Sequence, residues 1–279
     1  MQPDLKYVEK EIDGTHLWVR EDYDSVGLLR RLDLRRLQND PAAERVPTAR
    51  GTSVFRLRGE SKDLFVKFFL YNHWRHLLKA PFLKTKARLA WENAQMLLQA
   101  GFQTPSVVII GEKRVFGFVQ KAFFVTEAVE AVSLKAFLKN AFEESLSGSG
   151  ISRGLFFTRL GRLIGSLHAK GIYHGDLHPG NLWLLGPPVE ADFNLYFLDN
   201  EGVRRFQSLP ESRRLHDLRD LNDLRFASVK TKDRAYFFKA YLEENPRLFP
   251  TRKSFINALQ KISLRRHKGR RSFRPVIAL

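Results

Sequence analysis

Two hydrophobic patterns divide this chain into a first part with strand character and a second part with helix character. Short apolar runs rich in Val, Ile and Phe predict strands at 18–20, 46–67 and 102–129. In the second part, apolar residues at helical spacing predict a helix over 155–170 that ends at Gly171. Further helices are predicted over 133–141, 216–229 and 232–244. The pattern therefore predicts an α+β fold, in which a small strand-rich lobe precedes a mainly helical lobe.

Two helices are also predicted inside the strand-rich part. Residues 28–37 carry leucines near helical spacing among arginines, so this helix either packs on the small lobe or lies on an anionic membrane surface. We favour packing, because the segment lacks an aromatic anchor. The second helix covers 87–98 and is followed by Gly101, a common C-terminal cap. A turn is expected at 111–114.

One basic insertion separates the strand at 64–69 from the helix at 87–98. Residues 71–86 interleave Lys, Arg and His with large apolar side chains such as Trp74 and Phe82. That composition fits a segment at a membrane surface and a loop packed on the small lobe equally well.

The strongest chemical signal lies directly after the helix at 155–170. Residues 174–181 match H-x-D-L-x-x-x-N, the catalytic loop of the protein-kinase fold, with Gly175 where protein kinases carry Arg. In such a loop Asp176 accepts a hydrogen bond from the attacking hydroxyl and orients it, and Asn181 binds a magnesium ion at the ATP phosphates. His174 is expected to brace the loop. The motif predicts a phosphotransferase.

A lone lysine within an apolar strand is the next candidate. Lys67 lies within the apolar run 64–69, where an ammonium group needs a counter-charge or a route to solvent. In the kinase arrangement this lysine holds the α- and β-phosphates of ATP and pairs with a glutamate of the following helix. Glu92 is the candidate glutamate.

Two segments are candidates for the rest of the nucleotide site. Gly51, with the backbone and hydroxyl groups of Thr52 and Ser53, resembles a glycine-poor phosphate loop, although an ordinary hairpin turn explains the same residues nearly as well. Backbone groups from Glu127 to Val129 lie where the hinge of a kinase reads the adenine edge.

An acidic turn follows the strand predicted at 195–198. It occupies the position of the kinase D-F-G motif, so Asp199 is the expected second magnesium ligand. Asn200 and Glu201 stand where the phenylalanine would be, and Gly202 is displaced by one place. No long loop with a serine, threonine or tyrosine placed for phosphorylation follows. This argues against a protein kinase that is switched by loop phosphorylation.

The length of 279 residues suits one two-lobed catalytic domain. We expect an N-terminal extension over 1–45, an ATP-binding lobe over 46–130, a catalytic lobe over 131–260 and a basic tail over 261–279. The chain has no cysteine, so disulfides and thiolate metal sites are excluded. No signal peptide or membrane-spanning apolar run is evident, so a cytoplasmic location is expected.

Net charge adds an expectation about partners. The chain holds 47 Lys and Arg against 30 Asp and Glu, a net charge of +17. Such an excess attracts polyanions such as nucleic acid, anionic lipid head groups or phosphorylated glycans. No nucleic-acid-binding module accompanies it, so nucleic acid is not the expected partner.

These residues together resemble the lipopolysaccharide kinases of Gram-negative bacteria, the group that contains inner-core heptose kinases and Kdo kinases. The resemblance rests on 65–67, 91–92, Gly101, 104–105, 174–183, 198–199 and 217–218. It implies ATP and Mg²⁺ as cofactors, and an acceptor hydroxyl on an inner-core sugar of the lipopolysaccharide glycolipid. It also implies peripheral work on the anionic cytoplasmic face of the inner membrane.

Two alternatives stay open. One is another small-molecule or protein kinase of the same fold, although a strongly basic protein is poorly matched to a cationic aminoglycoside. The other is a non-catalytic pseudokinase that serves as a basic scaffold. A scaffold would need none of the five candidate residues Lys67, Glu92, Asp176, Asn181 and Asp199.

Overall fold

The computed structural model describes residues 6–48, 51–59, 62–71, 83–141, 153–186, 193–222 and 228–267. The chain divides into two units. The first unit comprises the described residues up to Met96 together with Pro105–Val129, and the second comprises Leu97–Thr104 and the described residues from Glu130 onward.

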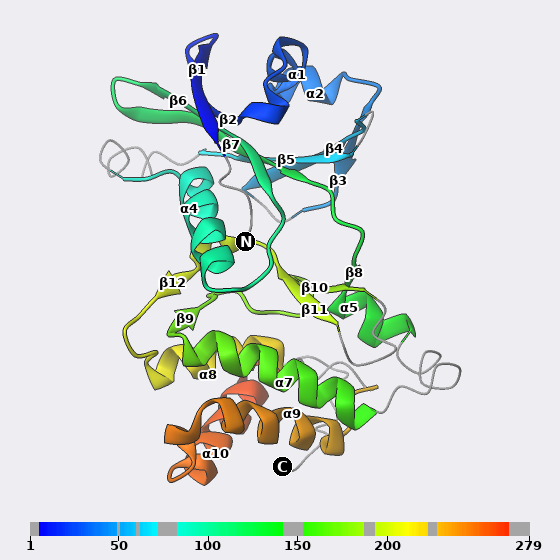
Figure 1. Cartoon of the computed structure of the whole chain (residues 1–279), viewed down its shortest axis with the longest axis vertical. Helices are drawn as coiled ribbons and strands as arrows, with labels where there is room; N and C mark the ends of the chain where they lie inside the picture. Colours follow the sequence, from blue (N-terminus) through cyan, green and yellow to red (C-terminus); the bar gives the residue numbers. More distant parts are fainter. Residues whose placement is uncertain are drawn as a thin grey trace. The chain divides into compact units, whose positions relative to one another are not determined.

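The described residues of the first unit form a seven-stranded antiparallel sheet (Figure 1). Its spatial order is β1-β2-β6-β7-β5-β4-β3. The strands are β1 (Tyr7–Ile12), β2 (Thr15–Arg20), β3 (Ala43–Val46), β4 (Thr52–Leu57), β5 (Leu64–Phe69), β6 (Val107–Val115) and β7 (Phe118–Glu127). The stretch 1–45, which we expected to be an extension, thus contributes β1, β2 and nearly all of β3 to this sheet.

Helices cover both faces of this sheet. A short 3₁₀ turn, η1 (Glu21–Tyr23), leads from β2 toward α1 (Val26–Arg31) and α2 (Leu34–Gln38), whose leucines join one core with Val66 and Phe68 of β5. On the opposite face, α4 (Lys86–Gln99) places its alanines against Phe69 and Val107. Figure 1 shows α4 and the α1–α2 pair on opposite sides of the sheet.

The helix predicted over 28–37 is in fact two short helices. Asp33 interrupts it: its backbone is extended, and its carboxylate accepts hydrogen bonds from the N–H groups of Arg35 and Arg36 at the start of α2. An aspartate that caps a helix competes with helix continuation, and the periodicity of the leucines conceals this break. The expectation that the segment packs on the small lobe is confirmed, since Leu29 and Leu37 are buried there.

The turn expected at 111–114 is also displaced. β6 continues through these residues, and the chain reverses at Phe116 and Gly117, whose φ angles are 49° and 81°. Two successive positive φ angles are typical of the tight turn that joins antiparallel strands. Gly111 is needed for another reason, because a Cβ there would lie 2.2 Å from the Phe123 ring.

The second unit is mainly helical. Its helices are α5 (Leu134–Ala136), the π-helical η3 (Phe137–Ala141), α7 (Arg153–Ala169), α8 (Glu211–Leu221), α9 (Thr231–Glu244), α10 (Arg252–His267) and the 3₁₀ turns η5 (Asn200–Gly202) and η6 (Pro246–Leu248). A small sheet has the order β11-β10-β8, and β12 pairs with β9. These strands are β8 (Val132–Ser133), β9 (Ile172–Tyr173), β10 (Leu182–Leu185), β11 (Asn194–Phe197) and β12 (Arg204–Arg205).

Several helix boundaries differ from expectation. α8 begins at Glu211, directly after Pro210, whose extended backbone suits the position before a helix. The basic tail expected from 261 is helical through His267 as the end of α10. Residues 268–279, and 72–82 of the basic insertion, lie outside the described residues. Within the described part of the chain, no helix combines the length and apolar character needed to cross a membrane.

Candidate active site

The residues of the predicted catalytic loop lie between β9 and β10 in the second unit. Within the loop, the N–H of His178 donates to the carbonyl of Asp176 at 2.9 Å, and the N–H of Asn181 donates to the carbonyl of His178 at 2.9 Å. The side-chain amide of Asn181 donates to both the carbonyl and the carboxylate of Asp176, at 3.0 and 3.1 Å. The Asp and Asn of the motif are therefore held together by a direct contact.

The carboxylate of Asp176 is accessible to a substrate. Its side chain is 55% exposed, and its other described neighbour is Nε2 of His178 at 3.7 Å. An exposed carboxylate held on one side by an amide can accept a hydrogen bond from an incoming hydroxyl on its free side.

Asp217 of α8 anchors the start of this loop. Its carboxylate is fully buried and accepts the backbone N–H groups of His174 at 2.7 Å and of Gly175 at 2.9 Å. His168 on α7 lies at 3.4 Å from the same carboxylate. Burial by itself would raise the pKa of Asp217, but hydrogen bonds from histidines and backbone N–H groups outweigh burial and hold the pKa well below its usual range. Asp217 is thus a buried carboxylate that positions the loop.

His174 is a packing residue. The side chain is fully buried, its ring centroid lies 5.9 Å from that of Phe197, and neither ring nitrogen has a hydrogen-bond partner in the described part of the chain. Burial lowers the pKa of the imidazole, which favours the neutral form. These observations agree with a bracing role and give no support for proton transfer by His174.

Strand pairing brings the two expected magnesium ligands to one end of a sheet. Leu182 of β10 pairs with Phe197 of β11, and the N–H of Leu198 donates to the carbonyl of Asn181 at 2.9 Å. Asp199 follows at once, exposed and in a left-handed conformation with φ 58°. Asn181 and Asp199 therefore lie on adjacent strand ends.

The neighbouring Asn200 has a structural role. Its buried amide donates to Oγ1 of Thr104 at 2.6 Å and to the carbonyl of Phe197 at 3.2 Å. The bond to Thr104 ties the acidic turn to the segment Leu97–Thr104 within the same unit.

The donor set at these strand ends fits Mg²⁺. The amide nitrogen of Asn181 is committed to Asp176, so its oxygen is the atom available to a cation, and Asp199 adds a carboxylate. No group of three His, Cys, Asp or Glu side chains suited to a metal occurs among the described residues. A site with one carboxylate and one amide oxygen matches the habit of Mg²⁺, which takes few protein ligands and completes its shell with phosphates and water.

The first unit carries the candidate lysine. Lys67 is buried on β5, and its ammonium group lies over the rings of Phe69 and Phe124, at 5.3 and 5.9 Å from their centroids. Glu92 of α4 is paired with Nζ of Lys84 at 2.7 Å and with Nε of Arg88 at 3.2 Å. The pairing of Lys67 with Glu92 stays a prediction.

The two hydroxyl residues of the glycine-poor turn, Thr52 and Ser53, lie on opposite faces of the sheet. Gly51 has φ 90°, and a Cβ there would meet no atom of the described residues within 4 Å. Oγ1 of Thr52 contacts Oγ1 of Thr48 at 2.9 Å. Thr52 pairs with Phe69, whereas Ser53 pairs with Phe68. Because side chains alternate along a strand, the buried Ser53 hydroxyl is on the face opposite Lys67 and does not fit the expected phosphate contact.

The expected hinge is largely occupied by contacts of its own. The carboxylate of Glu127 bonds to Arg20, to Tyr23 and to Lys62. The N–H of Glu127 donates to the carbonyl of Ser106 at 3.0 Å, and the N–H of Ala128 donates to that of Asp63 at 2.8 Å. The backbone N–H of Val129 therefore remains the candidate donor to the adenine edge of ATP.

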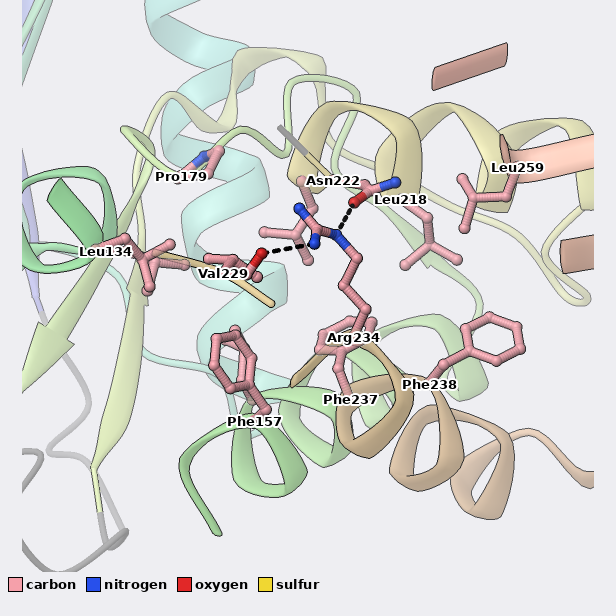
Figure 2. A pocket seen from close by; sticks show the side chains of 13 residues that line it. Leu134, Phe157, Pro179, Leu218, Asn222, Val229, Arg234, Phe237, Phe238 and Leu259 are labelled. Atoms are coloured by element: carbon pink, nitrogen blue, oxygen red, sulfur yellow. Dashed lines mark hydrogen bonds between the residues drawn. The ribbon is translucent and has the colours of Figure 1, made fainter. Parts of the chain in front are cut away.

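A separate apolar cavity lies in the second unit (Figure 2). It has a volume of about 80 Å³, and Figure 2 shows Phe157, Leu134 and Phe238 around it. Arg234 borders it and donates to Oδ1 of Asn222 at 3.0 Å and to the carbonyl of Val229 at 2.7 Å. The volume is well below the roughly 300 Å³ typical of a small-ligand pocket.

A strand-rich unit with a buried lysine, followed by a helical unit that holds the H-x-D-L-x-x-x-N loop, defines the two-lobed protein-kinase-like fold. This class includes kinases for proteins and for small molecules. The chain belongs to the lipopolysaccharide kinase (Kdo/WaaP) family, whose model matches residues 34–241.

Two known proteins illustrate the relationship. The lipopolysaccharide core heptose(I) kinase WaaP of Pseudomonas aeruginosa is 28% identical over 175 residues, which are 60% of this chain and 65% of that protein. The match therefore spans slightly less than two thirds of that relative. A solved structure of WaaP in complex with acyl carrier protein aligns with a TM-score of 0.62 at 20% identity, covering 90% of this chain and 99% of that one. This second likeness confirms the fold.

Proposed function

We propose that this protein is an ATP-dependent kinase that phosphorylates a sugar hydroxyl of the lipopolysaccharide inner core. The observation that carries the proposal is the direct contact of Asn181 with an exposed Asp176, in a loop anchored by buried Asp217. Membership of the lipopolysaccharide kinase family supports it.

In this proposal Asp176 accepts the hydrogen bond of the acceptor hydroxyl and orients its oxygen toward the γ-phosphate. Asn181 and Asp199 would hold the magnesium ion, which neutralises charge on the ATP phosphates when bound. Lys67 contacts the α- and β-phosphates, and Glu92 would leave its present partners to fix Lys67. Catalysis then rests on positioning and charge, because phosphoryl transfer asks for little covalent chemistry from the protein.

The acceptor is proposed to be heptose, with Kdo as the second candidate. The name of the Pseudomonas relative favours heptose. The net charge of +17 supports work at the anionic cytoplasmic face of the inner membrane, as a peripheral protein on a phosphorylated glycolipid. The same charge argues against a cationic acceptor.

The test is transfer of labelled γ-phosphate from Mg-ATP to purified inner-core lipopolysaccharide. We expect label on the glycolipid, and a fall of about 10²–10⁴-fold with Asp176→Ala while ATP binding is retained. A generic protein and an aminoglycoside serve as control acceptors. Label on one of these instead would keep the mechanism and discard the glycolipid. ATP binding without transfer to any acceptor would favour the scaffold alternative.

A further inference from the structure

A second pocket lies on the face of the sheet that α1 and α2 cover, and all of its lining residues belong to the first unit. Its volume is about 370 Å³, within the range of roughly 300–1,000 Å³ typical of small-ligand sites. Its apolar lining comes from Leu17 and Phe123 on the sheet and from Leu29 and Leu32 on the helical segment.

The polar lining of this pocket is strongly cationic. Five basic side chains and two carboxylates face it: Arg30, Arg35, Arg36, Lys113, Lys121, Asp13 and Asp33. These residues come from the β1–β2 turn, from α1 and α2, and from β6 and β7. The fold therefore gathers positive charge from distant parts of the chain around one hollow.

The two carboxylates are already committed. Asp33 caps α2 and accepts from Nζ of Lys121 at 3.3 Å. Asp13 lies 3.7 Å from Arg36, and both of these side chains are mostly exposed, which makes their attraction weak. The guanidinium groups of Arg30 and Arg35 make no hydrogen bond or ion pair with any described residue, and both residues are exposed.

The ammonium group of Lys121 lies among both kinds of charge. Burial lowers its pKa, Asp33 opposes that effect, and the nearby charges of Lys113 and Arg36 lower the pKa further. Burial is the main cause of this shift, so the support for a bound anion is the excess of basic side chains in the lining.

This pocket is distinct from the candidate nucleotide site. Lys67 points to the face of the sheet that holds Phe69 and α4, whereas Phe68 and Phe123 face the helices α1 and α2. Because side chains alternate along a strand, the full thickness of the sheet separates Lys67 from the pocket. An ATP phosphate held by Lys67 cannot occupy it.

We propose that this pocket binds a phosphate-bearing ligand, through the guanidinium groups of Arg30, Arg35 and Arg36. Guanidinium groups form paired hydrogen bonds with phosphate oxygens, and two of the three have no competing partner among the described residues. The apolar lining of Leu29 and Phe123 suits the carbon skeleton that carries the phosphate, either a soluble sugar phosphate or a lipid head group. The site extends beyond the proposed kinase reaction and does not depend on it.

The experiment compares two double variants of the full-length chain in a Lys67→Ala background, which weakens phosphate binding at the nucleotide site. Arg30→Ala/Arg35→Ala removes the two uncommitted guanidinium groups. Arg45→Ala/Arg58→Ala removes the same charge from exposed positions of the same unit that do not line the pocket. Calorimetry in magnesium-free buffer measures binding of inorganic pyrophosphate and glucose 1-phosphate, and flotation measures binding to phosphatidylcholine vesicles that contain phosphatidic acid.

We expect Arg30→Ala/Arg35→Ala to weaken binding of at least one probe by about tenfold or more, and Arg45→Ala/Arg58→Ala to leave it nearly unchanged. Loss confined to the soluble probes identifies a sugar phosphate, and loss confined to vesicles identifies a lipid head group. Equal loss in both double variants, or no binding of any probe, overturns the proposal. Arg30→Lys/Arg35→Lys keeps the charge without the fork-shaped donors and should weaken binding less. Thermal unfolding without ligand confirms that each variant is folded.

Discussion

At the scale of single residues, the catalytic loop depends on a carboxylate that makes no contact with substrate in our proposal. Asp217 accepts two successive backbone N–H groups, those of His174 and Gly175, at the point where the loop begins. A buried anion that accepts several N–H groups is strongly stabilised in its charged form, and its removal leaves those donors unpaired.

Asp217→Asn should therefore destabilise the protein by about 2–3 kcal/mol, because an amide cannot accept both N–H groups as the carboxylate does. Turnover should fall as well, since Asp176 lies two residues after His174. Urea unfolding and the γ-phosphate transfer assay measure the two effects. Glu211→Gln, at an exposed position in the first turn of the same helix, is the matched control and should largely retain both properties. Equal stability of the two variants would contradict the anchoring role.

The buried histidines predict the dependence of stability on pH. Burial lowers the pKa of His168 and of His174, so both stay neutral in the folded chain after the unfolded chain has begun to bind protons near pH 6.5. The unfolded state then holds more protons, so the free energy of unfolding decreases as pH falls. The loss is at most about 1.4 kcal/mol per pH unit for each histidine. Asp217, with its depressed pKa, adds a further loss only below about pH 4.

Urea unfolding between about pH 7.5 and about pH 5.5 tests this expectation. His174→Gln should show a smaller change of unfolding free energy across that interval than the unmodified chain. His16→Gln, at a partly exposed histidine, should leave the change as it was. An unaltered pH dependence in His174→Gln would rule out the contribution of this residue.

The sequence points to candidate residues for the chemistry, but not to the residues that support them. Asp176, Asn181 and Asp199 follow from a motif, because phosphoryl transfer needs those groups at fixed spacing. The anchoring bonds of Asp217 join positions more than 40 residues apart, and no local pattern encodes such a contact. The sequence also does not show which face of the sheet the Ser53 side chain occupies. A shift of one residue along a strand moves a side chain to the other face.

At the scale of elements, close packing of α7 on α9 depends on glycines. A Cβ at Gly161 would lie 2.2 Å from the backbone oxygen of Phe237 on α9. At Gly154, near the start of α7, a Cβ would instead lie 3.1 Å from the side-chain ring of Tyr236, which can move. The two glycines thus differ in what an added methyl group meets.

Gly161→Ala should destabilise the protein by about 1–2 kcal/mol, because the cost of overpacking exceeds the gain in helix propensity. Gly154→Ala should be neutral or slightly stabilising. Urea unfolding of the two variants provides the comparison. If Gly161→Ala were as stable as Gly154→Ala, the helices would not be held at the separation seen here.

Most elements follow from hydrophobic periodicity, and the differences have local causes. α4 and α7 agree closely with expectation because each has a clear apolar stripe and a glycine with positive φ just beyond its end. The helix predicted over 28–37 is broken because Asp33 caps α2, and the β6–β7 turn lies at the tight pair Phe116–Gly117 instead of the charged residues before it. The turn was predicted at 111–114 because these residues are mostly charged, but they belong to strand β6.

At the scale of the whole molecule, the charge of +17 should dominate association with anionic surfaces. Binding to lipopolysaccharide or to anionic vesicles should weaken steeply between about 50 mM and about 500 mM NaCl, since the screening length shrinks over that range. Co-sedimentation across a salt series measures this, with neutral phosphatidylcholine vesicles as the control. A flat salt dependence would remove the electrostatic argument for the glycolipid.

Gly175 determines whether phosphorylation of the chain can control activity in the way it does in protein kinases. Its φ of 86° is unfavourable for a side chain, and a Cβ there would lie 3.0 Å from the carbonyl oxygen of Gly202. Protein kinases use an arginine at this place to sense a phosphate added to their own chain, which couples output to upstream signals. Here the backbone itself excludes that sensor. A catalyst built on this loop therefore lacks the arginine through which an added phosphate switches protein kinases on, so phosphorylation of the chain cannot control it by that route.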